Sequence, residues 1–280
     1  MSSDSAFSNL QDLDHAVGVV VSSADGVIDT YGEPATVFPW ASVTKLLSAT
    51  ATLVAIDRGM VDLDSPAGPE GSTVRHLLAH ASGLPFDAGA ALSEPGKRRV
   101  YSNLGIETLA ERVAEAVGRD FAEWVEESVI APLGMSAMME GSPAHGASGS
   151  AEDLALLGRE LLAPTLLGQD LFAEATTVVF PGLPGVLPGF GRQEHNDWGL
   201  GFEIRDDKSP HWTGQRSSPR TFGHFGQSGS FLWVDPDAGL ATAFLGAEPF
   251  GEWATQVWPP LTDAILAEHA AHGRWSRSSG

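Results

Sequence analysis

Ser42 and Lys45 stand three positions apart at the start of an apolar segment. In a helix, residues at this spacing share one face, so the hydroxyl and the amine would be neighbours. Burial disfavours the charged ammonium and lowers the pKa of a lysine, which lets its amine accept the proton of a serine nucleophile. The pair therefore indicates acyl transfer through serine. Taken alone, it is more typical of a helix-capping serine beside a lysine that extends to solvent.

Two further clusters carry side chains of the same chemistry. Tyr101-Ser102-Asn103 follows a Pro-Gly turn and precedes a helical pattern, and Tyr101 is one of two tyrosines in the chain. A phenol near an ammonium ionises more easily, so a lysine and a tyrosine could move one proton together. The glycine-rich residues 223–230 lie at the entry to a strand and could line a cleft. The structural alternatives are a packing tyrosine and a bulge with a surface histidine.

Elements of two kinds must position these side chains. Short β-branched runs separated by turn residues predict strands towards both ends of the chain. Apolar residues at helical spacing predict a mostly helical middle section and a closing helix. Residues 181–191 are rich in Pro and Gly and predict an irregular loop. The predicted strands are 16–22, 27–31, 198–204, 231–234 and 240–245, and the predicted helices are 42–57, 106–117, 121–130, 151–162 and 252–269.

Composition excludes several classes of protein. Sixteen basic and thirty-six acidic residues give a formal charge of -20, which repels nucleic acids and anionic membrane surfaces. The chain has no cysteine, which excludes disulfides, thiol catalysis and cysteine-ligated zinc. Residues 46–56 form the longest nearly uncharged stretch and are too few to span a bilayer. No Lys or Arg precedes Lys45, so the start of the chain does not have the pattern of a secretory signal, and we expect a cytoplasmic protein.

Taken in order, the three clusters resemble the motifs of the β-lactamase-related serine hydrolases. The resemblance is strongest to the branch with class C β-lactamases, penicillin-recognising D-amino peptidases and carboxylesterases. Its motifs are Ser-Val-Thr-Lys at 42–45, Tyr-Ser-Asn at 101–103 and His-Phe-Gly at 224–226, and residues 73–85 and 131–135 match two further landmark segments of this family. An ordered set of five is far more specific than any one of them.

The resemblance implies an α+β fold of the β-lactamase/transpeptidase type. In that fold an antiparallel sheet is built from both ends of the chain and flanked by helices, with a mostly helical region inserted. We therefore expect a discontinuous sheet domain of residues 1–60 and 190–280 and a helical region of residues 61–189. The active site would lie at their interface.

The same resemblance assigns roles to individual residues. Ser42 would be the acylated nucleophile, Lys45 and Tyr101 would handle its proton, and Asn103 would hold Lys45 or the substrate. The backbone amides of Ser42 and Gln227 would form the oxyanion hole, a device that stabilises the transition state by several kcal/mol in general. The residues expected to bind substrate or support the site are Asn103, His224, Gly226 and Gln227.

The implied function is hydrolysis of small-molecule esters or amides through an acyl-enzyme. His224 stands where many penicillin-recognising relatives have a lysine, and a neutral histidine attracts carboxylates less. The connection at residues 86–94 is short in a region that often shapes the substrate cleft. Both departures favour a carboxylesterase-like enzyme over a β-lactamase or a D-amino peptidase. The alternative outside enzymes is an inactive relative that uses its cleft as a binding module.

The sequence indicates no metal and no cofactor. His76 and His80 have the i, i+4 spacing of a zinc pair, but Leu77 stands where the catalytic glutamate of H-E-x-x-H would be. The nucleophile elbow G-x-S-x-G of α/β-hydrolases is absent. The expected partner is a small-molecule ester, amide or lactam, with no nucleic acid and no membrane. The oligomeric state is not predicted.

Overall fold

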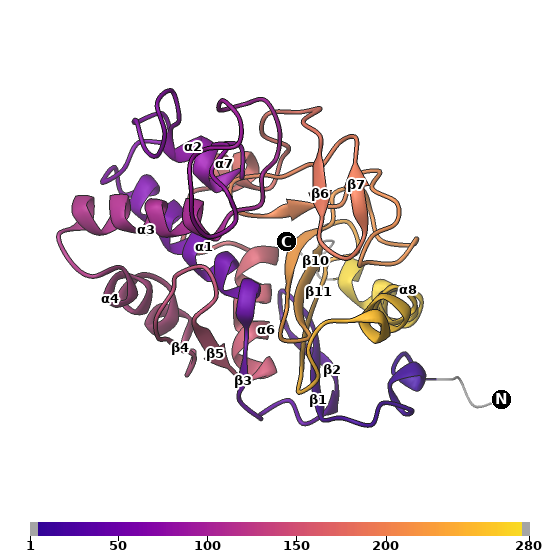
Figure 1. Ribbon diagram of the computed structural model, residues 1–280. Coiled ribbons are helices and arrows are strands. Elements are labelled where there is room, and N and C mark those ends of the chain that lie inside the picture. The colour runs from indigo at the N-terminus through magenta and orange to yellow at the C-terminus, as the bar shows by residue number, and fades with distance from the viewer. Residues whose placement is uncertain (1–4, 276–280) are drawn as a thin grey trace.

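A six-stranded antiparallel sheet forms the centre of the computed structural model, which describes residues 5–275 and side chains as far as residue 270. Its strand order is β2-β1-β11-β10-β9-β8, so strands from the two ends of the chain are neighbours, as expected (Figure 1). The remaining strands form two small sheets. The strands are β1 Val17–Ser23, β2 Gly26–Gly32, β3 Phe38–Pro39, β4 Met138–Met139, β5 Ala147–Gly149, β6 Gly185–Leu187, β7 Gly191–Gln193, β8 Glu203–Ile204, β9 Phe222–Gly226, β10 Ser230–Asp235 and β11 Leu240–Gly246.

Helices cover both faces of this sheet. In Figure 1 the closing helix α8 lies on one side, and α6, α1 and the other helices lie on the opposite side. A 3-10 turn precedes α1, and a π-helical turn continues α4. The helices and helical turns are η1 Ser8–Leu10, η2 Ala41–Val43, α1 Thr44–Asp57, α2 Val74–Leu78, α3 Asn103–Val117, α4 Phe121–Val125, η3 Glu126–Ile130, α5 Ala131–Leu133, α6 Ala151–Leu162, α7 Gln169–Ala175 and α8 Glu252–Trp275.

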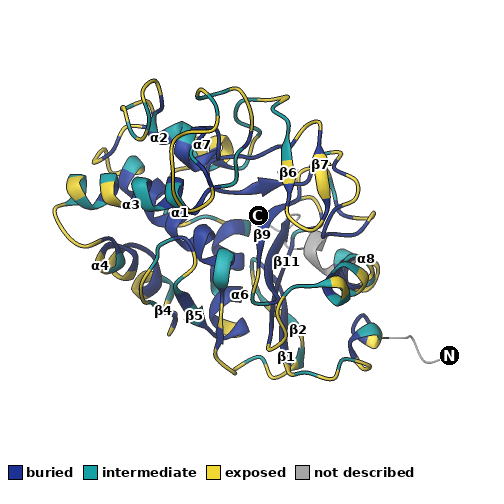
Figure 2. Cartoon of the chain, viewed as in Figure 1, coloured by how far each residue is buried: buried dark blue, intermediate teal, exposed yellow. Residues whose placement is uncertain are grey.

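The strands are apolar on both faces because each face meets a layer of helix. Successive side chains of a strand point to opposite faces. Val19 therefore packs in the cluster beside α8, and Val20 packs in the larger cluster beside α1 and α6. Phe231 and Leu232 of β10 divide in the same way. Figure 2 shows the central strands as buried throughout, which explains why their sequence is continuously apolar and does not alternate.

Helix α6 links the helical region to the sheet. It lies within residues 61–189, which were expected to form the helical region, and it packs against β1, β10 and β11. A Cβ atom added to Gly158 would lie 3.0 Å from the Ala241 Cβ, so the absent side chain allows this close approach. The helix begins at a capping box, in which the Ser150 hydroxyl accepts from the Asp153 amide and the carboxylate accepts from the Ser150 amide.

The strand predicted at 198–204 is wrong for most of its length, because only Glu203–Ile204 pair as β8. The preceding residues pass over α1 and away from the sheet. A Cβ atom on Gly201 would lie 2.2 Å from the Ala49 Cβ of α1, and the Gly201 amide donates to the Leu78 carbonyl. Two glycines in an apolar run therefore mark a close approach to a helix and end the strand early.

The prediction that residues 181–191 are irregular is also wrong in part, because β6 and β7 form a short hairpin there. Its turn contains Pro188 and Gly189, and the φ of Gly189 is +78°. The Pro and Gly residues thus supply the turn between two strands. No helix within residues 5–275 is both long and apolar enough to cross a bilayer.

The packing of α6 yields a prediction on stability. Leu157 is fully buried, whereas its neighbour Leu156 is half-buried at the edge of the same cluster. We expect Leu157→Ala to lower the free energy of unfolding by about 2–5 kcal/mol, because it leaves a cavity against the sheet. Leu156→Ala makes the same chemical change and should lower it far less. Urea denaturation of both variants measures the difference, and equal losses would contradict this packing.

Candidate active site

The turn that carries Ser42 is held from two sides. The Trp40 amide donates to the Ala147 carbonyl of β5 at 2.9 Å, and the Trp40 carbonyl accepts from the Ser230 hydroxyl of β10 at 2.9 Å. Ala41 has a φ of +44°, a conformation that is uncommon for residues other than glycine. Ser42 lies in the 3-10 turn η2, just before α1, and is half-buried. Ser42 is thus fixed between the sheet and the helical region.

Lys45 is buried beneath this serine with 1% of its surface exposed. Its Nζ lies 3.2 Å from the Ser42 Oγ, and it donates to the Asn103 Oδ1 at 2.6 Å and the Ala144 carbonyl at 3.0 Å. Burial lowers the pKa of Lys45 from its usual 10.5 to about 7, although the carboxylates of Asp87 and Glu107 act in the opposite direction. An amine with this pKa is available as a base near neutral pH.

Asn103 connects Lys45 to the start of helix α3. Its side-chain oxygen accepts from Lys45, and its Nδ2 donates to the Asp87 Oδ1 at 2.9 Å, which fixes the orientation of the amide. The preceding Ser102 caps the helix, because its hydroxyl accepts from the Gly105 amide at 2.8 Å. The helix cap thus sets the position of the residue that holds the amine.

Tyr101 and His224 form a second polar pair beside Ser42. The Tyr101 hydroxyl lies 2.9 Å from the His224 Nε2, and the Phe225 amide donates to the His224 Nδ1 at 2.9 Å. Because Nδ1 accepts, a neutral imidazole carries its hydrogen on Nε2 and donates it to the phenol oxygen. Burial, followed by the charge of Lys45, lowers the pKa of His224 to about 3, so it is neutral at physiological pH.

The Tyr101 phenol stays protonated in this environment. Its ring contacts Phe86, His80 and Trp198, and the Lys45 Nζ lies 4.7 Å from its centroid. Burial raises the pKa of Tyr101 above its usual 10, and a hydrogen bond with Ser42 opposes this shift without cancelling it. Tyr101 can therefore act as a proton donor next to the nucleophile.

Strand β9 brings a backbone edge against the nucleophile. A Cβ atom on Gly226 would lie 2.5 Å from the Trp40 carbonyl oxygen and 3.2 Å from the Ser42 amide nitrogen. The missing side chain therefore allows the end of β9 to approach the turn of Ser42. The amide of Gln227 follows directly, while its side chain donates to the Phe250 carbonyl at 3.2 Å and is exposed. This arrangement suits an oxyanion hole formed by the amides of Ser42 and Gln227.

The two histidines of the 73–85 segment play different parts. His76 lies in α2 and its Nδ1 is 2.9 Å from the Thr73 hydroxyl, whereas His80 lies beyond the helix with a φ of +52°. The His80 Nδ1 accepts from the Ser102 amide at 3.2 Å, and its ring packs against Trp198. Both rings thus have structural contacts, and His80 supports the segment that carries Tyr101.

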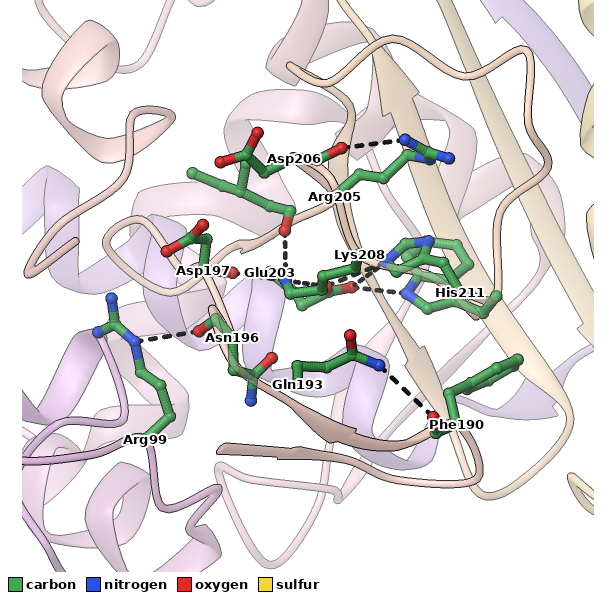
Figure 3. Close-up of polar contacts among 12 residues, drawn as sticks. Arg99, Phe190, Gln193, Asn196, Asp197, Glu203, Arg205, Asp206, Lys208 and His211 are labelled. Carbon is green, nitrogen blue, oxygen red and sulfur yellow. Dashed lines mark hydrogen bonds and ion pairs between the residues drawn. The ribbon is translucent and has the colours of Figure 1, made fainter. Parts of the chain in front are cut away.

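A buried charged cluster lies on the far side of β9. Glu203 pairs with Gly223, the residue before His224. Its carboxylate accepts from Lys208 and from His211 at 3.0 Å (Figure 3). It also accepts from the Trp212 indole at 2.6 Å. Burial alone would raise the pKa of Glu203, but Lys208 and His211 outweigh it and hold this pKa well below its usual range. The ion pair ties β8 to the loop that follows it, at the edge of the sheet beside β9.

The structure brings all the expected site residues together in one place. Ser42, Lys45, Tyr101 and His224 lie in a continuous set of contacts, and Gly226 leads into Gln227 at its edge. Sequence reasoning missed Asp87, which orients Asn103, and the cluster around Glu203. Asp87 stands only two residues beyond a landmark proline, yet nothing in the local sequence indicates its distant partner.

Comparison with known proteins agrees with this arrangement. Residues 16–264 match the family described as Beta-lactamase. The chain belongs to that family. This confirms the resemblance inferred from the five motifs and, with it, the expected α+β fold. Members of the family are serine hydrolases and acyltransferases.

Three relatives show how far the likeness extends. A crystal structure of a beta-lactamase from Mycobacterium bovis is 51% identical, covers 95% of this chain and 100% of its own, and has a TM-score of 0.93. The D-alanyl-D-alanine-carboxypeptidase/endopeptidase AmpH of Escherichia coli K12 is 27% identical over 164 residues, 42% of this chain and 43% of AmpH. The match thus spans less than half of AmpH. EstCE1, a hydrolase with promiscuous acyltransferase activity, shares the fold at 17% identity, with a TM-score of 0.73 over 89% of this chain and 93% of its own.

The close approach of β9 to Ser42 gives a prediction. In Gly226→Ala the new methyl group meets the Trp40 carbonyl, so β9 must move away from the Ser42 amide. We expect the rate of Ser42 acylation by an activated ester to fall about 100-fold, as for loss of an oxyanion donor. Gly26→Ala is the matched control, because a Cβ there meets nothing within 4 Å. Stopped-flow measurement of the burst compares them, and an unchanged burst in Gly226→Ala would exclude this edge from catalysis.

Proposed function

We propose that the protein is a carboxylesterase-like hydrolase that cleaves small-molecule esters through an acyl-enzyme at Ser42. One observation carries the proposal. The buried Lys45 amine contacts the Ser42 hydroxyl while two carbonyl oxygens, those of Asn103 and Ala144, occupy its other directions. A neutral amine has two hydrogens and one lone pair. The two carbonyls take the hydrogens, which leaves the lone pair directed at the serine proton.

Acylation follows from these positions. Ser42 Oγ attacks the ester carbonyl carbon as Lys45 takes its proton, and the carbonyl oxygen becomes an oxyanion against the amides of Ser42 and Gln227. When the tetrahedral intermediate collapses, the bond to the leaving oxygen breaks, and the Tyr101 phenol supplies the proton for that oxygen. The proton held by Lys45 then restores the phenol. The neutral His224 supports this step, because its Nε2 hydrogen stabilises the phenol oxygen while its proton is away.

Deacylation repeats the chemistry with water as the nucleophile. A water molecule on the carbonyl of the acyl-enzyme loses a proton to Lys45, and its oxygen forms the new bond to carbon. Collapse of the second intermediate breaks the bond to Ser42 Oγ, which receives the proton held by Lys45 and regenerates the hydroxyl and the neutral amine. The product acid then leaves. An alcohol in place of water would give acyl transfer by the same steps.

Two features support esters as substrates ahead of β-lactams. His224 is neutral, so it places no positive charge near a substrate carboxylate as a lysine would. The neutral phenol of Tyr101 is suited to protonate an alkoxide leaving group. Hydrolysis of β-lactams is the second candidate, and the observation in its favour is the 51% identical beta-lactamase from Mycobacterium bovis.

The central test compares purified protein with Ser42→Ala. We expect turnover of short-chain aryl esters, slower turnover of a chromogenic cephalosporin and little of D-amino-acid amides. Ser42→Ala should abolish all turnover above background, and mass spectrometry should locate the trapped acyl group on Ser42. Unchanged turnover in Ser42→Ala would overturn the proposal. Loss of every activity in the unmodified protein would instead favour an inactive binding relative.

The assignment of Lys45 as base predicts a pH dependence. The neutral amine is the active form, so kcat/KM should rise with pH and level off above about 7, the pKa of Lys45. The Asp87 carboxylate raises this pKa, so Asp87→Asn should move the rising limb of the pH profile to lower pH. The side-chain amide oxygen in this variant can still accept the hydrogen bond from Asn103 Nδ2. Asp25→Asn, in the distant β1–β2 turn, removes an equal charge and should leave the profile in place. A limb that Asp87→Asn does not move would contradict Lys45 as the titrating group.

A further inference from the structure

A cavity of about 470 Å³ opens beside Tyr101. One wall comes from residues 86–100, the connection that leads to Tyr101, and the other from the β6–β7 hairpin. Ser42 itself does not line the cavity. Because Tyr101 is both a wall of the cavity and a neighbour of Ser42, a molecule bound there would extend from the reacting ester.

The walls are apolar although they face solvent. Phe86, Leu92 and Val186 are 51%, 57% and 60% exposed, and all three line this cavity. Pro184 and Pro188 of the hairpin complete the apolar surface. Large apolar side chains that gather on one solvent-facing concavity are typical of a ligand site. They would hold the hydrocarbon or aromatic part of a substrate.

Two arginines stand among these apolar side chains. Arg98 and Arg192 line the cavity and are exposed. The Arg98 guanidinium makes one long contact with the Leu92 carbonyl at 3.4 Å, and within residues 5–270 no salt bridge reaches either arginine. In a chain with a formal charge of -20, two unneutralised guanidinium groups on one apolar cavity form a local site for an anion.

The wall that carries Arg192 is fixed before any ligand binds. The Arg99 amide donates to the Pro184 carbonyl at 2.9 Å, and the Arg99 Nε donates to the Asn196 carbonyl at 3.1 Å (Figure 3). A Cβ atom on Gly185 would lie 2.8 Å from the Arg99 Cβ, so the hairpin packs directly on this residue. A wall held in this way lowers the ordering cost of binding.

We propose that this cavity binds an apolar arm of the ester substrate that ends in a carboxylate, which Arg98 and Arg192 recognise together. The inference rests on the proposed function, since the cavity is read as an extension of the same site. Guanidinium groups bind carboxylates by paired, charge-assisted hydrogen bonds. The anion is thus recognised at the outer end of the arm, away from Lys45 and the neutral His224.

The test compares an anionic substrate with its neutral counterpart. The 4-nitrophenyl monoester of octanedioic acid carries a free carboxylate on its acyl arm, and the methyl 4-nitrophenyl diester lacks the charge. In a second pair, 3-(4-acetoxyphenyl)propanoic acid and its methyl ester, the free carboxylate or its methyl ester is on the leaving phenol and not on the acyl arm. We expect the protein to prefer the acid in at least one pair. The double variant Arg98→Gln/Arg192→Gln should lower kcat/KM for that acid about tenfold, through KM, and change the neutral ester less than twofold.

Arg216→Gln is the matched control, because Arg216 is an exposed arginine beside α8 and outside the cavity. It should leave the preference unchanged. An equal loss for acid and neutral ester in the double variant, or no preference in either pair, would overturn the proposal and indicate a cavity for uncharged arms.

Binding separates this failure from failure of the proposed function. Calorimetry with monomethyl octanedioate and dimethyl octanedioate on Ser42→Ala protein reports the cavity without any turnover. Tighter binding of the acid that disappears in Arg98→Gln/Arg192→Gln supports the site even if ester hydrolysis fails. Hydrolysis that depends on Ser42 but is indifferent to the acid supports only the proposed function.

Discussion

The burial of one amine governs the architecture of the cleft. Only 1% of the surface of Lys45 is exposed, so its polar hydrogens need acceptors inside the protein. These come from Asn103 at the start of α3 and from the Ala144 carbonyl before β5, two places far apart in the chain. A buried polar group left without a partner costs about 1–3 kcal/mol, so α1, the start of α3 and the segment before β5 must meet at this point. The same burial lowers the pKa of Lys45, and this lowered pKa is what would allow its amine to act as a base.

A second buried lysine is stabilised in a different way, by an ion pair. Lys208 is also removed from solvent, but it faces the carboxylate of Glu203, which His211 and Trp212 hold as well. The low pKa of Glu203 means that this pair stays ionised. Ion pairs of this kind add little net stability, yet removing one partner is strongly destabilising. Lys45 thus holds α1 to α3 and to the segment before β5 through neutral acceptors, whereas Lys208 binds β8 as a paired cation.

Local signals in the sequence predicted much of this structure. The spacing of Ser42 and Lys45 indicated a shared face, and the β-branched runs indicated strands at both ends of the chain, which the family resemblance placed in one sheet. Contacts between distant segments had no such signal. Gly201 lies in an apolar run that is typical of a strand. No neighbouring residue in the sequence indicates that it packs against Ala49 of α1. The orientation of Asn103 by Asp87 likewise depends on how the chain folds back.

Arg99 ties three loops together by an unusual means. Its guanidinium donates to the carbonyls of Ala79, Val179, Phe180 and Asn196, and so contacts main chain in every case. Main-chain acceptors are the same whichever side chains a loop carries. These contacts fix the path of the chain around the β6–β7 hairpin whatever its side chains, so mutations in the hairpin other than at Gly185, which packs on Arg99, can accumulate without disturbing Tyr101. The residues that line the cavity could therefore change during evolution, or in libraries of loop variants, while the position of Tyr101 stays the same. Substrate preference would then change without a change in the catalytic residues.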